Sequence, residues 1–181
     1  MRIIGGKYRG KKLFSPQNEG IRPTSDRTRE AVFNILRSLL GNDWSSLKML
    51  DVFAGTGAVA LEAVSQGVGE VTLIDKNPAT VLKNCALFPQ EQSKIKVLKA
   101  DAQSLKPASQ PYDLLFMDAP YQQNLSTPAL AQLAQNNWLA NQALCIIEVE
   151  QHETLILPPQ FTMFDERTYG LARIVFARYQ A

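Results

Sequence analysis

The chain has 181 residues, of which 45% are hydrophobic and 20% are charged, and this balance predicts one globular domain with a sizeable core. No apolar run approaches the roughly 20 residues that a membrane span needs, and the N-terminal MRIIGGKYRGKK lacks the apolar core of a signal peptide. A single histidine, His152, and two distant cysteines, Cys85 and Cys145, exclude a Cys/His zinc site and a disulfide framework. We therefore expect a cytoplasmic protein, a monomer, with no metal and no membrane contact.

Positive charge is concentrated at the N-terminus. Residues 1–37 contain nine Lys and Arg against three Asp and Glu, whereas the remainder contains ten against fourteen. This asymmetry indicates a nucleic-acid-binding face at the N-terminus and a different ligand elsewhere. A solvated charged hairpin is the alternative.

The first 41 residues predict an arm followed by a helix. RIIGGKYRGKKL alternates β-prone residues with glycines and lysines, which is typical of a hairpin with little apolar surface to bury. In RPTSDRTREAVFNILRSLLGN the apolar residues recur at helical spacing; Thr24 or Ser25 can cap the start, and Gly41 can end the helix. Residues 16–23 are a plausible hinge between arm and core. Three arginines are expected near the outer faces of this helix: Arg27, Arg29 and Arg37.

From residue 47 onward, a short apolar run closed by an aspartate occurs four times, and the closing residues are Asp51, Asp75, Asp101 and Asp118. Helical segments, GAVALEAVSQG and NPATVLKNCALF, follow the first two runs, so the pattern predicts a parallel α/β sheet. Acids at the carboxyl ends of such strands line the crevice where these sheets bind ligands. The last three runs, ALCIIEVE, FTMFDERTYG and LARIVFARYQ, are strand-like, and two of them are expected to form an antiparallel hairpin at one sheet edge.

The turn DVFAGTG, residues 51–57, follows the first run. A phosphate site uses backbone N–H groups without a fixed negative charge nearby, so Asp51 argues against a pyrophosphate, and no Lys-Ser/Thr pair completes a P-loop. A carboxylate suits a cation instead, and S-adenosylmethionine carries a sulfonium and an ammonium. Gly55 and Gly57 would then let the backbone approach the ligand closely. A structural turn without a ligand is the alternative.

Two further carboxylates fit an adenosine. Asp75 follows Asp51 by 24 residues, close to the offset of about 20 at which an acid meets the ribose hydroxyls in Rossmann-like sites. Asp101 could reach the adenine amine while the backbone of Ala102 reads the ring edge, although a surface acid at a strand end is equally compatible. The expected cofactor site also includes Phe53, Ala54 and Lys76.

The segment MDAPY, residues 117–121, resembles the (D/N)PP(Y/F/W) motif of methyltransferases that modify exocyclic amines of nucleobases. Hydrogen bonds from the two amine protons to the Asp118 carboxylate and the Ala119 carbonyl would direct the nitrogen lone pair at the methyl group. Pro120 holds Ala119 extended, and Tyr121 offers a ring on which a flipped base can stack. Alanine stands where the motif has its first proline, which keeps the carbonyl but reduces rigidity.

Together with RIIGGKYRGKKL, IRPTSDRTREAVFNIL, LDVFAGTGAVALEAVSQG and VTLIDKN, this motif makes the chain similar to the RsmD family of bacterial 16S ribosomal RNA guanine-N2 methyltransferases. The resemblance implies a Rossmann-like class I methyltransferase fold, a mostly parallel seven-stranded sheet with an antiparallel edge hairpin, over residues 23–181. Residues 1–22 would be a basic arm of the same domain. It also implies methyl transfer from S-adenosylmethionine to the N2 amine of guanine 966 in 16S RNA of the small ribosomal subunit, free or partly assembled.

The resemblance also suggests roles at the N-terminus. Thr24 would help hold the methionine end of the cofactor, although a helix cap is an equally simple role. The basic residues would grip RNA phosphates, while Tyr8 would stack or pack. The expected RNA-binding residues are Lys7, Tyr8, Arg9, Lys11, Lys12, Arg22, Arg27 and Arg29.

Three other functions remain compatible with parts of the sequence. The DAPY chemistry would also serve an adenine-N6 or cytosine-N4 methyltransferase of DNA or RNA. An NAD(P)-dependent oxidoreductase would use the same sheet, but it tolerates an acid before its glycine turn poorly. A ribosome-assembly factor with a weakened active site would explain Ala119.

Overall fold

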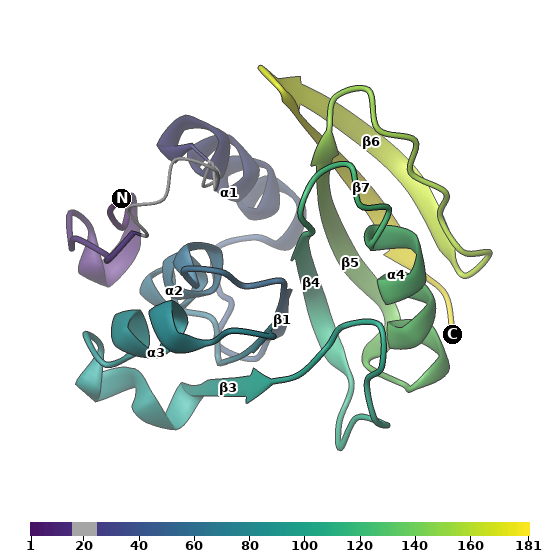
Figure 1. Cartoon of the computed structure of the whole chain (residues 1–181). Helices are drawn as coiled ribbons and strands as arrows, with labels where there is room; N and C mark the ends of the chain where they lie inside the picture. Colours follow the sequence, from purple (N-terminus) through teal and green to yellow (C-terminus); the bar gives the residue numbers. More distant parts are fainter. Residues whose placement is uncertain (16–24) are drawn as a thin grey trace.

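The structure, a computed structural model, describes residues 1–15 and 25–181. One seven-stranded sheet has the order β3-β2-β1-β4-β5-β7-β6 (Figure 1). Its strands are β1 (Lys48–Val52), β2 (Glu70–Asp75), β3 (Ile95–Lys99), β4 (Tyr112–Asp118), β5 (Leu139–Glu150), β6 (Phe161–Tyr169) and β7 (Ala172–Tyr179). Strands β1 to β5 are parallel, whereas β7 runs antiparallel to both β5 and β6. The predicted sheet, including its antiparallel edge hairpin, is confirmed.

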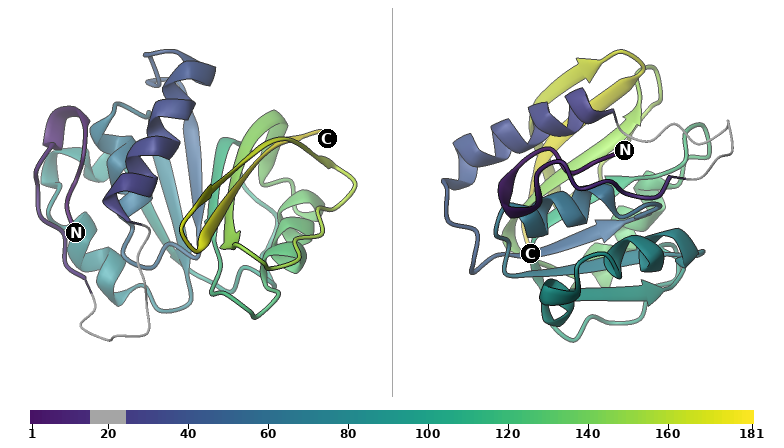
Figure 2. Two further views of the ribbon diagram at one scale, coloured as in Figure 1. Left: turned by 90° about the horizontal axis from the view of Figure 1, so that it is seen from above. Right: turned by 90° about the vertical axis from the view of Figure 1, so that its left-hand side faces the viewer.

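Helices cover both faces of the sheet (Figures 1 and 2). On one side lie α1 (Asp26–Leu40), α2 (Ala58–Ser65) and α3 (Ala79–Cys85), and on the other lies α4 (Ser126–Gln135). Two short 3-10 turns, η1 (Gly6–Tyr8) and η2 (Pro89–Lys94), complete the described elements. Within residues 1–15 and 25–181, no helix has the length and apolar character to cross a membrane.

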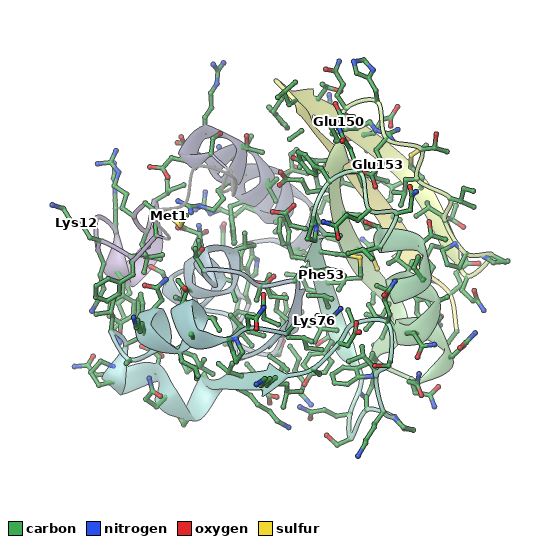
Figure 3. The ribbon with its side chains drawn as sticks, viewed as in Figure 1. Met1, Lys12, Phe53, Lys76, Glu150 and Glu153 are labelled. Atoms are coloured by element: carbon green, nitrogen blue, oxygen red, sulfur yellow. The ribbon has the colours of Figure 1, made fainter. Side chains whose placement is uncertain are left out.

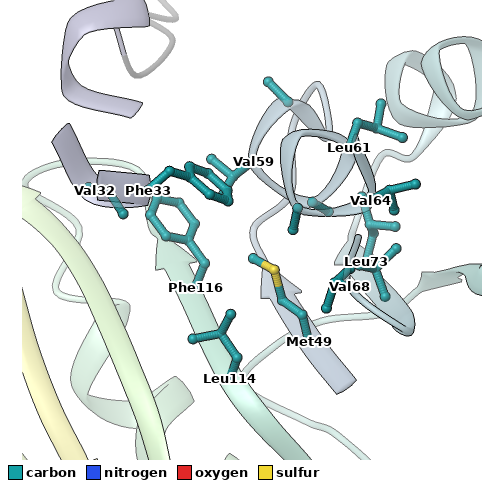
Figure 4. Packing of buried hydrophobic residues seen from close by; sticks show 14 of the residues in the cluster. Val32, Phe33, Met49, Val59, Leu61, Val64, Val68, Leu73, Leu114 and Phe116 are labelled. Carbon is teal, nitrogen blue, oxygen red and sulfur yellow. The ribbon is translucent and has the colours of Figure 1, made fainter. Parts of the chain in front are cut away.

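The strands divide their apolar side chains between two core layers because successive residues of a strand point to opposite faces. Met49, Leu114 and Phe116 belong to the layer that packs under α1, α2 and α3, whereas Leu115 and Met117 belong to the layer under α4. Figure 4 shows Phe33 of α1 packing between α2 and the Phe116 side chain of β4. Helix α1 is therefore part of the core and holds the N-terminal region to the sheet.

Helix α1 begins and ends as its sequence predicts. Ser25 is the N-cap, since its hydroxyl accepts a hydrogen bond of 3.1 Å from the Thr28 N–H. Gly41 ends the helix with φ at 77° and donates to the Arg37 carbonyl. Thr24, the other candidate cap, lies outside the described residues, as do the predicted hinge and the predicted arm boundary at residue 22.

The direction in which successive strands are added to the sheet reverses between β1 and β4. From β1 the chain adds β2 and β3 on one side, and from β4 it adds β5 on the other. In open α/β sheets ligands bind at such a switch point, outside the carboxyl ends of the strands. Val52 and Met117 are register partners, so the glycine turn after β1 and the DAPY segment after β4 leave the sheet side by side.

Candidate cofactor and substrate site

Asp51 lies under the glycine turn. It is the second-last residue of β1, and its side chain is 2% exposed with Oδ2 accepting a hydrogen bond of 3.3 Å from the Ala60 N–H of α2. Burial raises the pKa of this carboxyl to about 7, while the Ala60 N–H opposes the shift. The expected carboxylate beside the turn is present, but it faces the start of α2 from within the protein.

The backbone of the turn is shaped by three residues with positive φ: Phe53 at 61°, Gly55 at 56° and Gly57 at 73°. A Cβ on Gly57 would lie 2.7 Å from Val81 Cγ2 and 3.0 Å from Leu73 Cδ2, whereas a Cβ on Gly55 would meet only the Phe53 carbonyl oxygen at 3.8 Å. The missing side chain of Gly57 thus makes room for α3, and the expectation that its backbone also approaches a ligand stays a prediction. Gly55 is the position with open space.

Asp75 at the end of β2 fixes two backbone groups. Its Oδ2 accepts 2.8 Å from the Gly55 N–H, and its Oδ1 accepts 2.7 Å from the Asn77 N–H. Through these two bonds the carboxylate joins the glycine turn to the loop after β2. It is also partly exposed. A ribose at this edge would meet the outer lone pairs of a carboxylate already held in position.

Asp101 lies two residues beyond β3 and forms an ion pair with Lys76 at 3.1 Å. The Gln103 N–H and then Lys76 lower the pKa of Asp101, which stays ionised. The side chain of Ala102 is buried beside these groups. Figure 3 shows Phe53 and Lys76 on loops at the same end of neighbouring strands, so the expected cofactor residues after β1, β2 and β3 share one edge of the sheet.

The DAPY segment leaves β4 at that edge. Asp118 is the last residue of β4. The next residue, Ala119, is 5% exposed, and Pro120 after it is exposed. The Tyr121 hydroxyl donates a hydrogen bond of 2.9 Å to Oε1 of Glu148, which is 3% exposed on β5. Glu148 is the register partner of Asp118, so two acids stand on adjacent strands.

Glu148 lies in the candidate site but is not among the residues that the sequence predicted. It sits in the apolar run CIIEVE, where a carboxylate inside a buried strand could have marked it. The arrangement can present a carboxylate, a backbone carbonyl and an anchored aromatic ring to one planar amine beside the glycine turn. Such groups could hold an amine through its two N–H groups and align its lone pair.

The N-terminal arm is a compact hairpin that packs on the core (Figure 2). It contains one antiparallel bridge, between Arg2 and Lys12, around the 3-10 turn η1. Ile3 is 1% and Leu13 7% exposed, so the expectation of little apolar surface to bury is wrong for these two residues. A Cβ on Gly6, at φ 73°, would stand 1.9 Å from the Ser65 carbonyl oxygen, which shows how closely the arm meets α2.

Part of the positive charge of the arm is used inside the protein. Lys7 Nζ and the Tyr8 hydroxyl each lie 2.8 Å from Oε1 of the buried Glu91, and hydrogen bonding from Lys7 is the main reason that the pKa of Glu91 falls to about 2. The rings of Tyr8 and Phe88 pack edge to face, with their centroids 5.0 Å apart. Lys11 Nζ lies 5.5 Å from the centroid of the Tyr8 ring. Tyr8 therefore packs rather than offering a free stacking face.

Arg29 contradicts the expectation of an RNA-binding side chain. It is 1% exposed and donates 2.7 Å to the Arg2 carbonyl and 2.8 Å to Asp26. Burial lowers its pKa. The apolar face of α1 packs on the core, and Arg29 shares that face with Val32 and Phe33 one turn away, which is why it cannot reach RNA.

Other basic side chains remain at the surface. Arg9, Lys12 and Arg27 are exposed. A cavity of about 690 Å³ lies between the arm and α1, and its charged lining consists of four arginines and three acids, Asp26, Glu30 and Glu62. These arginines are Arg2, Arg9, Arg27 and Arg37. Arg22 lies outside the described residues.

Comparisons with known proteins agree with the fold. A family model described as Conserved hypothetical protein 95 matches residues 1–178. The chain is 37% identical to ribosomal RNA small subunit methyltransferase D of Haemophilus influenzae, over 94% of this chain and 90% of the relative. The solved structure of Escherichia coli yhhF superposes with a TM-score of 0.83 at 32% identity and covers 100% of this chain and 98% of that one.

The fold also matches a SAM-dependent methyltransferase from Aquifex aeolicus, with a TM-score of 0.61 at 19% identity over 83% of this chain and 89% of that one. The Rossmann-like methyltransferase fold is thereby confirmed. With a family model that spans nearly every residue, the resemblance to RsmD is confirmed too: the chain belongs to the Conserved hypothetical protein 95 family, which is the RsmD family.

Proposed function

We propose that the protein transfers a methyl group from S-adenosylmethionine to the exocyclic N2 amine of a guanine in 16S ribosomal RNA, at guanine 966 by its resemblance to the RsmD family. The observation that carries this proposal is the adjacency of the glycine turn after β1 and the DAPY segment after β4 at the switch point of the sheet. The name of the Haemophilus relative, a methyltransferase of small-subunit ribosomal RNA, supports the substrate class.

The cofactor would lie along the carboxyl ends of β1, β2 and β3. Asp75 would bind the ribose hydroxyls, and Asp101 with the Ala102 backbone would bind the adenine, as their positions after β2 and β3 allow. Phe53, Ala54, Gly55 and Gly57 would form the wall near the methionine part, and Lys76 would keep Asp101 oriented. S-adenosylmethionine supplies an electrophilic methyl group on a sulfonium.

The Asp118 carboxylate and the Ala119 carbonyl would each accept a hydrogen bond from one N–H of the exocyclic amine of the flipped guanine. These two hydrogen bonds would direct the nitrogen lone pair toward the methyl group that S-adenosylmethionine would supply, with S-adenosylhomocysteine as the leaving group, and Asp118 would take up the proton that the nitrogen releases. Tyr121, held through its hydroxyl by Glu148, would stack on the base. These steps use carboxylate, carbonyl and aromatic groups that the described site provides.

RNA would approach over the arm and the start of α1. Arg9, Lys12 and Arg27 are exposed there, and the arginine-lined cavity beside them can take backbone phosphates. Lys7 and Lys11 would also attract RNA phosphates through their exposed parts. At the same time they hold the arm on the core, Lys7 through Glu91 and Lys11 through the Phe88 ring. We place the protein in the cytoplasm as a monomer, acting on the small ribosomal subunit or an assembly intermediate.

The test is methylation with radiolabelled S-adenosylmethionine and small subunits from a strain that lacks the enzyme, followed by digestion and identification of the labelled nucleoside. Label in N2-methylguanosine at one position is the expected result. Label in methyladenosine or methylcytidine would keep the mechanism and replace the substrate. Tight cofactor binding without label would favour an assembly factor, with Ala119→Pro as the variant to restore turnover.

The matched variant is Asp118→Ala. We expect it to lose activity by about 10²- to 10⁴-fold, since it removes the group that accepts the amine proton, with S-adenosylhomocysteine affinity largely kept. Undiminished methylation by this variant would remove the carboxylate from the mechanism.

A further inference from the structure

Asn84 of α3 joins the N-terminal arm to the glycine turn. Its side chain has 0% of its surface exposed. Its Oδ1 accepts a hydrogen bond of 2.7 Å from the Phe14 N–H, and its Nδ2 donates to the Phe14 carbonyl at 3.0 Å and to the Thr56 carbonyl at 2.8 Å. Phe14 belongs to the arm and Thr56 to the turn between Gly55 and Gly57. One buried amide thus links two segments that are distant in sequence.

The chemistry of the carboxamide explains why this link is strong. An asparagine side chain offers two N–H donors and a carbonyl acceptor, so it can serve a backbone N–H and two carbonyls at once. A buried polar group that loses its partner costs about 1–3 kcal/mol. If the arm leaves, Asn84 loses its two hydrogen bonds to Phe14 and keeps only the one to the Thr56 carbonyl. If the turn changes shape, the Thr56 carbonyl loses its donor.

Two neighbouring contacts make the same connection. The Thr56 hydroxyl lies 3.4 Å from the Met1 sulfur, and Met1 accepts a hydrogen bond from the Leu13 N–H on the opposite side of the hairpin. One turn before Asn84, Val81 packs where a side chain on Gly57 would stand. Residues three apart share one face of a helix, so α3 supports the turn with Val81 and Asn84 together.

We infer that Asn84 is a positioning residue that couples docking of the N-terminal arm to the shape of the glycine turn, and through it to cofactor affinity. The inference rests on the proposed function, because it requires that the turn binds S-adenosylmethionine. Coupling of this kind is reciprocal, so the cofactor should hold the arm in place as much as the arm favours the cofactor.

Two variants and one control separate this role from general destabilisation. Asn84→Leu removes the three hydrogen bonds and keeps a similar volume. Asn84→Asp keeps the shape and the acceptor for the Phe14 N–H, but when ionised it cannot donate to the carbonyls of Thr56 and Phe14. The control is Ser65→Ala: Ser65 is also buried, donates 2.6 Å to the Gly5 carbonyl and accepts 2.9 Å from the Tyr8 N–H, so it anchors the arm away from the turn.

The measurements are the calorimetric affinity for S-adenosylhomocysteine, the KM for S-adenosylmethionine, and amide hydrogen exchange at Phe14 and Tyr8 with and without S-adenosylhomocysteine. In the wild type the ligand should slow exchange at Phe14. Asn84→Leu should lower the affinity for S-adenosylhomocysteine about tenfold and raise the KM for S-adenosylmethionine by a similar factor, with kcat nearly unchanged. In this variant the ligand should no longer slow amide exchange at Phe14. Asn84→Asp should lose affinity while the Phe14 amide stays protected. Ser65→Ala should speed exchange at Tyr8 with wild-type affinity.

Three outcomes would overturn the inference: wild-type affinity in Asn84→Leu and Asn84→Asp, unchanged ligand protection of Phe14 in Asn84→Leu, or an equal loss of affinity in Ser65→Ala. Should Asn84→Leu fail to fold, the isosteric Asn84→Asp and the control decide alone. A wild-type protein that binds no S-adenosylhomocysteine would instead refute the proposed cofactor, and with it this coupling. A wild type that binds while the variants match it refutes the coupling alone.

Discussion

The hydroxyl of Tyr121 donates a hydrogen bond of 2.9 Å to Glu148, and Glu148 is the strand partner of Asp118 across β4 and β5. The ring that follows the DAP turn is therefore tied to the strand next to the one that carries the proposed catalytic carboxylate. A ring fixed in this way loses less freedom when a base stacks on it.

Variants of this pair should separate the ring from its anchor. Tyr121→Phe keeps the ring and should reduce kcat/KM several-fold, whereas Tyr121→Ala also removes base stacking, worth about 1–3 kcal/mol. Glu148→Gln keeps an acceptor for the hydroxyl and should retain more activity than Glu148→Ala. Steady-state kinetics on small subunits would measure the series. Equal activity of Tyr121→Ala and the wild type would exclude a stacking role.

The buried Asp51 predicts a pH-dependent stability. Its pKa is raised by burial from 3.8 to about 7, so the folded protein binds this proton more tightly than the unfolded chain. The corresponding stabilisation is complete below the ordinary pKa and is lost as pH rises through about 7. We expect the free energy of unfolding to fall over this window by up to about 4 kcal/mol. Urea denaturation at a series of pH values measures it.

Asp51→Asn is the matched variant, since an amide keeps the shape and an acceptor for the Ala60 N–H without titrating. It should flatten the pH profile and be more stable than the wild type above pH 7. A bound sulfonium and ammonium would favour ionised Asp51, so affinity for S-adenosylmethionine should rise with pH over the same window in the wild type. An identical pH profile in both proteins would contradict the assignment.

Gly57 should not tolerate a side chain. It adopts the left-handed α conformation, with φ at 73° and ψ at 13°, and a Cβ there would stand 2.7 Å from the buried, β-branched Val81. Gly57→Ala should therefore cost about 1–2 kcal/mol in backbone strain and about 1–3 kcal/mol more through overpacking. Urea denaturation measures the loss of stability. A loss no larger than the backbone strain alone would show that packing against α3 does not constrain the turn.

The exposed basic residues should govern the salt dependence of RNA binding. Replacing Arg9, Lys12 and Arg27 together by Gln removes three candidate phosphate contacts, so the slope of log affinity against log salt should decrease by about 2, at about 0.7 per contact with single-stranded RNA. Arg29→Met is the control: it should lower the melting temperature and leave the slope unchanged, because Arg29 is buried. A triple variant with the wild-type slope would place the RNA elsewhere.

The sheet, its edge hairpin and the position of the candidate site follow from local patterns in the sequence. Alternating apolar runs closed by aspartates, followed by helical segments, leave few other arrangements, since periodicity and turn residues are local properties. The DVFAGTG and MDAPY segments fall at the ends of neighbouring strands, as parallel-sheet connections dictate. Helix α1 begins after Ser25 and ends before Gly41, as predicted, because capping also depends on local chemistry.

Which side chains are free to act depends instead on how the chain folds. Arg29 and Arg27 are alike in the sequence, yet one is buried against the arm and the other exposed, because packing between distant segments selects the face of the helix. Packing between distant segments also places Val81 where a side chain on Gly57 would stand, and it brings Glu148 of β5 to Tyr121, which follows the adjacent strand β4. Asn84 links the arm and the turn through contacts that no local pattern encodes, since hydrogen bonds between remote segments exist only once the chain has folded.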